Sequence, residues 1–245
     1  MPGELERITQ NRIVKLFQNK EGLGYTYLGN WEEREDTSNI EVELLTKYLE
    51  RQGYSSAHIN RAIFELQSVS TNFNDSLYTT NKKVYELLRF GVPVKVNAGD
   101  NYETVKLFNW TDTLDNDFSF AEEVTYKGNK TKRPDIVIYV NGIALGVIEL
   151  KRGIVDIGEG IRQNITNQQD RFIRPFFSTV QILFAGNDSE GLRYGTINTE
   201  EKWYLSWKED IEDASQLMLD KYLQKMCDKE RFMELLYDFV LFDGG

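Results

Sequence analysis

Two apolar runs lie close together in RPDIVIYVNGIALGVIELKRG, residues 133–153. They cover residues 135–140 and 143–150, are rich in Val and Ile, and are separated by Asn141-Gly142. An Asn-Gly pair between two β-branched runs is a strong signal for a tight hairpin turn. This stretch therefore predicts two paired strands at the centre of the fold.

The chain before this hairpin is mainly helical in its apolar spacing. We predict helices at 4–17, 40–52, 56–69 and 79–90, and strands at 104–110 and 118–126. After the hairpin we predict a helix at 156–172, strands at 180–185, 192–197 and 203–207, and helices near 214–226 and 229–241. Strands followed by a helix and another strand favour an α/β fold, a mixed β-sheet flanked by helices.

We divide the chain into three segments. Residues 1–95 are the mainly helical N-terminal part, 96–210 the core that contains the hairpin, and 211–245 the C-terminal helices. Repeats and Pro/Gly/Ser-rich linkers, which mark firm domain boundaries, are absent from the sequence.

Composition excludes several classes of protein. No apolar run approaches the ~18 residues of a membrane helix, and the charged start MPGELERITQ lacks the apolar core of a secretory signal. One cysteine, Cys227, rules out an internal disulfide, and one histidine, His58, rules out a His-rich metal cluster. We therefore expect a cytoplasmic protein that does not enter a membrane.

Charge is unevenly distributed along the chain. The net charge is −10, which argues against an autonomous high-affinity nucleic-acid binder. Residues 127–174 nevertheless hold nine Lys/Arg and five Asp/Glu, giving +4 there and −14 over the remainder. Such a basic island is either a face that contacts a phosphate backbone or a solvated face of mixed charge.

Acidic and basic side chains flank the predicted hairpin. Asp135 opens the first run, and Glu149-Leu150-Lys151 closes the second. Hard cations such as Mg²⁺ favour carboxylate and carbonyl oxygens, and a nearby lysine helps to orient an attacking water and to stabilise developing charge. Residues two apart in a strand face the same side, so Glu149 and Lys151 lie together with the Leu150 carbonyl between them.

Whether Asp135 joins them depends on the register of the hairpin. A regular two-residue loop pairs Asp135 with Ile148, which places Asp135 and Glu149 on opposite faces. A three-residue loop, or a bulge elsewhere, shifts the register by one and brings Asp135, Glu149 and Lys151 to one face. We therefore predict an odd loop or a β-bulge.

The chain resembles the N-terminal part of a type I restriction enzyme R subunit, which cleaves and translocates DNA. The resemblance rests on segments spread over most of the sequence: ITQNRIVKLF (8–17), LGYTYLGNWEERE (23–35), SNIEVELLTKYLERQGYS (38–55), RPDIVIYVNGIALGVIELKRG (133–153) and WYLSWKED (203–210). It implies a PD-(D/E)xK restriction-endonuclease-like fold with helical additions at both ends.

The resemblance also implies roles for individual residues. Asp135 and Glu149 match the metal-binding acids and Lys151 the catalytic lysine, with the Leu150 carbonyl as a possible further ligand. A helix-borne glutamate before the core strands matches Glu41, with Glu43 as the alternative. In the Gln-x-x-x-Tyr motif after the lysine, Gln163 matches the glutamine, but Asn167 stands where a tyrosine is expected.

The function implied is Mg²⁺-dependent cleavage of double-stranded DNA, in a complex with methyltransferase (M) and specificity (S) subunits. Candidates for phosphate contacts are Lys127, Lys130, Lys132, Arg133 and Arg152. No G-x-x-x-x-G-K-[ST] is present, so we expect ATP to act only through a motor region that follows in a longer polypeptide. The alternatives are a catalytically silent docking or DNA-binding domain and a stand-alone repair nuclease.

Overall fold

A seven-stranded mixed sheet forms the centre of the computed structural model, which describes residues 4–72, 74–99, 101–208 and 216–243. Its strands lie in the order β1 (Thr26–Asn30), β4 (Phe118–Glu122), β7 (Ile136–Val140), β8 (Ile143–Leu150), β9 (Ile182–Asn187), β10 (Gly191–Gly195) and β11 (Leu205–Ser206). The β1–β4 and β8–β9 pairs are parallel and the other pairs antiparallel. The predicted α/β fold with a mixed sheet is confirmed.

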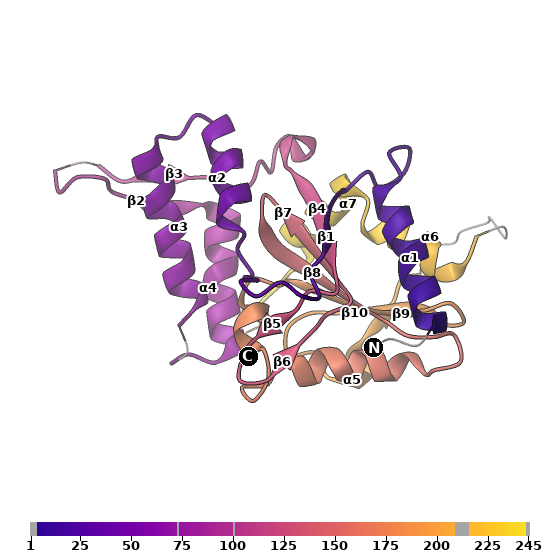
Figure 1. The fold of residues 1–245 in the computed structure, drawn as a ribbon. Helices are drawn as coiled ribbons and strands as arrows, with labels where there is room; N and C mark the ends of the chain where they lie inside the picture. The colour runs from indigo at the N-terminus through magenta and orange to yellow at the C-terminus, as the bar shows by residue number, and fades with distance from the viewer. Residues whose placement is uncertain (1–3, 73, 100, 209–215, 244–245) are drawn as a thin grey trace.

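Helices flank this sheet on its two faces. They are α1 (Glu4–Gln18), α2 (Val42–Arg51), α3 (Ser56–Ser70), α4 (Leu77–Phe90), α5 (Ile157–Asn167), α6 (Met218–Met226) and α7 (Lys229–Glu234), which continues as a π-helical turn at Leu235–Phe239. Short 3₁₀ turns occur at Thr113–Asp115, Arg174–Ser178 and Glu201–Trp203. In the view of Figure 1, α2, α3 and α4 lie to the left of the sheet, α1 and α6 to its right, and α5 runs beneath.

Two small hairpins lie outside the sheet: β2 (Val92–Val94) with β3 (Glu103–Val105), and β5 (Tyr126–Lys127) with β6 (Thr131–Lys132). The strand predicted at 104–110 is therefore largely wrong, because only its first residues pair with β2. Strand β1 was not predicted, since TYLGN is short and contains a glycine. The helix predicted over 156–172 ends at Asn167 and is followed by turns.

Two apolar clusters cover the two faces of the sheet. The larger one joins α1, α6 and α7 to strand residues such as Ile138 and Ile148, and it also contains residues of α2, α3 and α4. The smaller one joins α5 to the opposite face, with Val137, Val147 and Ala185 among its members. The C-terminal helices therefore pack on the central sheet itself.

The central hairpin combines a two-residue turn with a β-bulge. Asn141 and Gly142 have φ of 50° and 80°, as a type I′ turn requires, and Val140 pairs with Ile143. Between the Tyr139–Ala144 and Ile138–Gly146 pairs the register shifts, leaving Leu145 as the extra residue on β8. The predicted alternative of a bulge is thus the one that the chain adopts.

Two of the predictions fall partly on residues that the structure does not describe. The first two residues of the helix predicted at 214–226 and the boundary drawn at 210/211 lie outside them. Among the residues that the structure does describe, every helix is too short or too polar to cross a lipid bilayer.

Candidate active site

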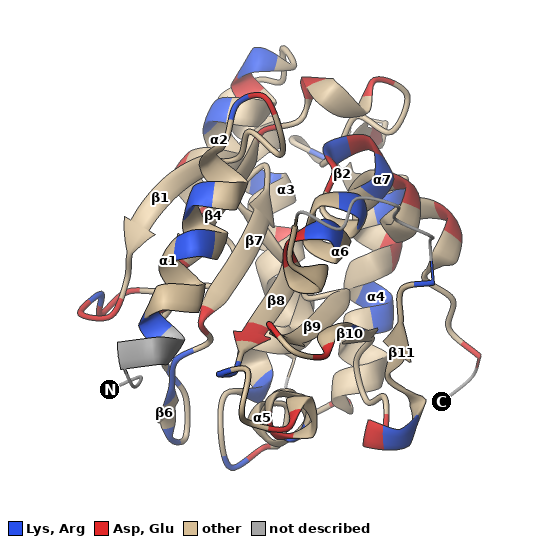
Figure 2. Ribbon diagram, turned by 90° about the vertical axis from the view of Figure 1, so that its right-hand side faces the viewer, with Lys and Arg blue, Asp and Glu red and all other residues tan. Residues whose placement is uncertain are grey.

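The bulge places the acidic side chains of the hairpin together at one end of the sheet. Ile136 pairs with Ile148, so Asp135, one residue earlier, stands across from Glu149. Figure 2 shows acidic residues at the start of β7 and the end of β8, with basic residues on β6 and directly after β8. The parallel strands β8 and β9 end here with their carboxyl ends, the edge at which ligands bind open α/β sheets.

Asp135 is tied to the strand that carries Glu149. Its Oδ2 accepts a hydrogen bond of 2.6 Å from the backbone N–H of Leu150. A charge-assisted bond of this kind fixes the carboxylate more firmly than a neutral one. Asp135 also acts directly on Glu149, because its carboxylate is among the causes that raise the pKa of Glu149. The two predicted metal ligands therefore lie side by side.

Glu149 is fully buried, with 0% of its surface exposed. Its Oε2 accepts a hydrogen bond of 2.6 Å from Gln163 Nε2, and Asn167 Nδ2 lies 3.4 Å from its Oε1. Burial raises the pKa of Glu149 well above its usual range, and the neighbouring Asp135 carboxylate raises it further, while Lys151 lowers it. An ionised Glu149 thus requires a positive partner.

Lys151 is held at the same place by two hydrogen bonds. Its Nζ donates to Gln163 Oε1 at 2.8 Å and to the carbonyl oxygen of Leu150 at 3.1 Å. Gln163 therefore bridges the lysine and Glu149 through the two ends of its amide. The structure brings together Asp135, Glu149, Lys151 and Gln163, four residues that the sequence predicts for the catalytic site.

Helix α5 approaches the sheet closely enough to deliver Gln163 and Asn167. At Gly160 an added Cβ would stand 3.2 Å from Ala185 Cβ and 3.5 Å from the Glu149 carbonyl oxygen. Because Gly160 has no side chain, the helix axis can lie near β8 and β9. The next turn of the helix then places its amides beside the acids.

Glu123 belongs to the same end of the sheet and was not predicted. Its backbone N–H donates to the Asp135 carbonyl at 2.8 Å, and its carboxylate pairs with Arg133 Nε at 2.5 Å. Its negative charge is one of those that raise the pKa of Glu149. The sequence holds no signal for it, because an acid near the end of a predicted strand, 118–126, is ordinarily solvent-exposed.

Glu41 lies elsewhere. Its backbone N–H donates to the Gly142 carbonyl, at the turn of the hairpin, and its carboxylate pairs with Arg34 at 2.7 Å. Ile143, next to that turn, and Glu149 are six positions apart on β8, which is about 20 Å of extended strand. The structure therefore does not bring Glu41 to the other acids, and the alternative, Glu43, is exposed on α2.

The five residues predicted to contact phosphates differ in their surroundings. Three lysines lie on the β5–β6 hairpin: Lys127 pairs with Glu35 at 3.1 Å, while Lys130 and Lys132 lie over the Phe172 ring. Arg152 is half-buried directly after Lys151. Arg133 instead pairs with two acids, Glu32 and Glu123.

The donor set suits a hard divalent cation. Within the described residues, no group of three or more His, Cys, Asp and Glu side chains is arranged to hold a metal ion. The candidate set is two carboxylates and the Leu150 carbonyl, the kind of partial oxygen shell that Mg²⁺ completes with water. Asn167 Oδ1, buried beside Glu149, has no hydrogen-bond partner and supplies one more oxygen for such a water.

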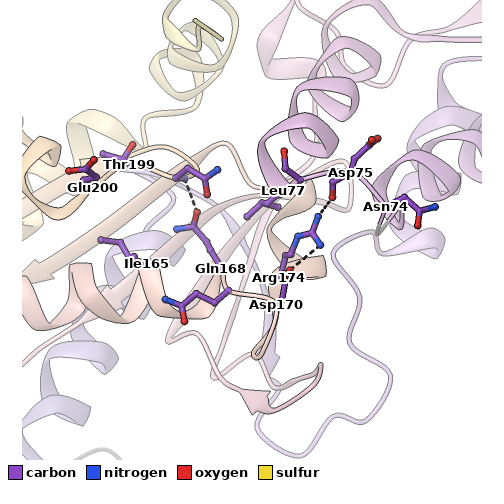
Figure 3. A pocket seen from close by; sticks show the side chains of 12 residues that line it. Asn74, Asp75, Leu77, Ile165, Gln168, Asp170, Arg174, Thr199 and Glu200 are labelled. Carbon is purple, nitrogen blue, oxygen red and sulfur yellow. Dashed lines mark hydrogen bonds and ion pairs between the residues drawn. The ribbon is translucent and has the colours of Figure 1, made fainter. Parts of the chain in front are cut away.

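A separate cavity of about 730 Å³ lies between the start of α4, the end of α5 and the loop after β10. In Figure 3, Arg174 reaches toward Asp170 and Asp75, and Gln168 points toward the loop that follows β10. Its lining holds three acids and one arginine, which disfavours a phosphate, and it includes none of the residues of the acid cluster.

Comparisons with known proteins identify the family. The model for "Type I restriction enzyme R protein N terminus" matches residues 4–202. A putative type I restriction enzyme MjaIXP endonuclease subunit of Methanocaldococcus jannaschii is 23% identical, over 99% of this chain and 26% of its own length. The type I restriction enzyme HindI endonuclease subunit of Haemophilus influenzae is 27% identical, over 68% of this chain and 17% of its own.

The chain thus spans about a quarter or less of the length of these relatives. The family match covers most of the chain, including the hairpin and α5. It confirms the resemblance inferred from the sequence. The chain belongs to the family of type I restriction enzyme R protein N-terminal regions.

Proposed function

We propose that this chain is the DNA endonuclease region of a type I restriction enzyme and that it hydrolyses the phosphodiester backbone of double-stranded DNA with the help of Mg²⁺. The observation that supports this most directly is the pair of facing carboxylates, Asp135 and buried Glu149, with Lys151 beside them. Two acids held together in a dry place repel each other unless a cation or a proton lies between them.

The proposed roles follow from the contacts of each residue. Asp135 and Glu149 would hold the ion, with the Leu150 carbonyl as a further oxygen; the ion would supply charge neutralisation on the scissile phosphate. Lys151 would orient the attacking water and stabilise the charge that develops. Gln163, hydrogen-bonded to both Lys151 and Glu149, would fix the positions of these two side chains relative to each other.

Phosphate contacts would come from the β5–β6 hairpin and the residue after the lysine. Lys127, Lys130, Lys132 and Arg152 are the proposed set, and they would position the duplex without reading its sequence. Arg133, whose guanidinium pairs with Glu32 and Glu123, is left out of this set. Recognition of the target would fall to a specificity subunit, assembled with a methyltransferase subunit in the cytoplasm. ATP-driven movement would fall to a motor region outside this chain.

Titration of the chain with Mn²⁺, followed by calorimetry, tests the metal site directly. We expect one site in the wild type and its loss in Asp135→Asn, because the amide keeps an acceptor for the Leu150 N–H but removes the charge. Asp170→Asn is the matched control, since that carboxylate is 82% exposed and pairs with Arg174. Equal Mn²⁺ binding by the wild type and Asp135→Asn would overturn the proposal and favour a silent docking domain.

A further inference from the structure

Glu123, directly after β4, has an unusual backbone conformation and is buried, although it carries a charge. Its φ of 52° lies in the left-handed region, which residues other than glycine adopt uncommonly. It is 5% exposed. Backbone strain of this kind persists only where the surroundings enforce it.

The left-handed turn joins β4 to the segment that carries Asp135. The N–H of Glu123 donates to the Asp135 carbonyl at 2.8 Å, and the N–H of Val124 donates to the Pro134 carbonyl at 2.9 Å. Both bonds run from the strained turn to the residues just before β7. Glu123 is therefore attached by its backbone to the acid that would bind the ion.

The carboxylate of Glu123 shares one guanidinium with a second acid. Arg133 Nε lies 2.5 Å from Glu123, and Arg133 also pairs with Glu32. The Glu32 side chain is 40% exposed, whereas that of Glu123 is 7% exposed. Water screens the first pair more than the second, so the buried pair dominates the local field.

We propose that Glu123 is a further acidic residue of the cation site and that Arg133 is its built-in counter-ion, the two together setting how tightly the site holds a divalent ion. This inference rests on the proposed function. Glu123 is a positioning residue in it: its charge attracts the ion, and its backbone holds Asp135. Arg133 opposes that attraction by neutralising Glu123.

The two partners must then act in opposite directions. Removing the charge of Glu123 leaves Arg133 paired only with the more exposed Glu32, so its positive charge near the ion is less compensated and cation binding weakens. Removing the charge of Arg133 frees Glu123 to attract the ion, which strengthens binding. Removing both charges leaves the net charge of the pair at zero, as in the wild type. A merely structural ion pair would instead lower the stability in both single variants and leave cation affinity alone.

The experiment is a Mn²⁺ titration of four proteins, the wild type, Glu123→Gln, Arg133→Gln and the double variant, followed by calorimetry or electron paramagnetic resonance. We expect affinity to fall about threefold or more in Glu123→Gln and to rise about threefold or more in Arg133→Gln. The double variant is expected within about twofold of the wild type, as a coupled pair requires.

Glu122→Gln is the matched control, because it removes the same charge one residue away. The carboxylate of Glu122 accepts hydrogen bonds from Gln10 Nε2 at 3.0 Å and the Tyr27 hydroxyl at 2.5 Å, apart from Arg133. We expect its affinity for Mn²⁺ to stay within about twofold of the wild type. An equal loss in Glu122→Gln and Glu123→Gln would show general electrostatics and overturn the inference.

The remaining outcomes separate this inference from the proposed function. Wild-type protein that binds no Mn²⁺ overturns both. Binding that is lost in Asp135→Asn but unchanged in Glu123→Gln, or weakened in Arg133→Gln, overturns the inference alone. If Glu123→Gln does not fold, Arg133→Gln still decides, because damage to the fold does not tighten a cation site.

Discussion

At the scale of single residues, the burial of Glu149 has a consequence for stability. The raised pKa of Glu149 means that the metal-free folded protein keeps a proton that the unfolded chain loses above about pH 4.3. Its contribution to stability is therefore present at low pH and is lost as the pH rises toward the raised pKa. Between the unfolded pKa and the raised folded pKa, each rise in pH therefore lowers the stability of the metal-free protein.

Glu149→Gln is expected to remove this pH dependence. The amide is neutral at every pH and can still accept the hydrogen bond of Gln163. We expect the variant, in EDTA, to exceed the wild type by at least about 1 kcal/mol at pH 8 and to match it more closely at pH 5. Urea unfolding at the two pH values measures the difference. A wild-type pH dependence that survives in the variant would contradict this account.

Lys151→Ala is expected to separate metal binding from cleavage. Removing a positive charge beside the carboxylates retains or strengthens cation binding, whereas the transition state loses its stabilising partner. We expect DNA cleavage by the assembled enzyme to fall by about 10² to 10³, with Mn²⁺ affinity no weaker than in the wild type. Parallel cleavage assays and titrations check both. Loss of Mn²⁺ binding in this variant would argue against the assigned role.

The sequence predicted part of this cluster. Asp135, Glu149 and Lys151 follow from their order around a hairpin, and Gln163 from the resemblance. Asn167, doubted because it replaces a tyrosine, lies against Glu149. Glu123 could not be predicted, because its contribution depends on a left-handed backbone that places it beside a strand distant in the sequence.

At the scale of elements, the central hairpin depends on a glycine. Gly142 has a φ of 80°, and an added Cβ would stand 2.7 Å from the Glu41 carbonyl oxygen and 2.8 Å from Leu44 Cβ. We expect Gly142→Ala to lower the free energy of unfolding by about 2–4 kcal/mol, from both backbone strain and the collision with α2.

Gly53→Ala is the control for that variant. Gly53 also has a positive φ, 86°, but an added Cβ there meets nothing within 4 Å. Its substitution should cost only about 1–2 kcal/mol, the price of the backbone conformation. Urea unfolding of both variants measures the difference, and equal costs would contradict a collision at Gly142.

The position of the β-bulge is a feature of the hairpin that the sequence did not predict. Asn141-Gly142 predicted the turn correctly, and the need to bring Asp135 and Glu149 to one face predicted a register shift. The position of the shift, at Leu145, could not be predicted from local propensity, because IALGVI (143–148) has no polar residue and every residue of β8 is buried. A run without polar alternation carries no signal of its register.

At the scale of the whole molecule, the C-terminal helices are part of the core. The sequence suggested a separate segment over 211–245, since amphipathic spacing does not tell which surface a helix covers. In the structure, Phe232 is fully buried, and its ring lies 3.4 Å from where a Cβ of Gly146 on β8 would stand. Leu219 and Met226 share the same cluster as Ile138 and Ile148.

Phe232→Ala is therefore expected to destabilise the entire domain. Loss of a large buried ring costs about 3–5 kcal/mol, and because it opens the cluster on β8, the whole sheet should unfold at a lower urea concentration in one transition. Far-UV circular dichroism and tryptophan fluorescence should give coincident midpoints. Phe239→Ala, at a side chain 66% exposed, should change the stability by no more than about 0.5 kcal/mol. Two separate transitions in Phe232→Ala would mean that the helices fold apart from the sheet that carries the acids.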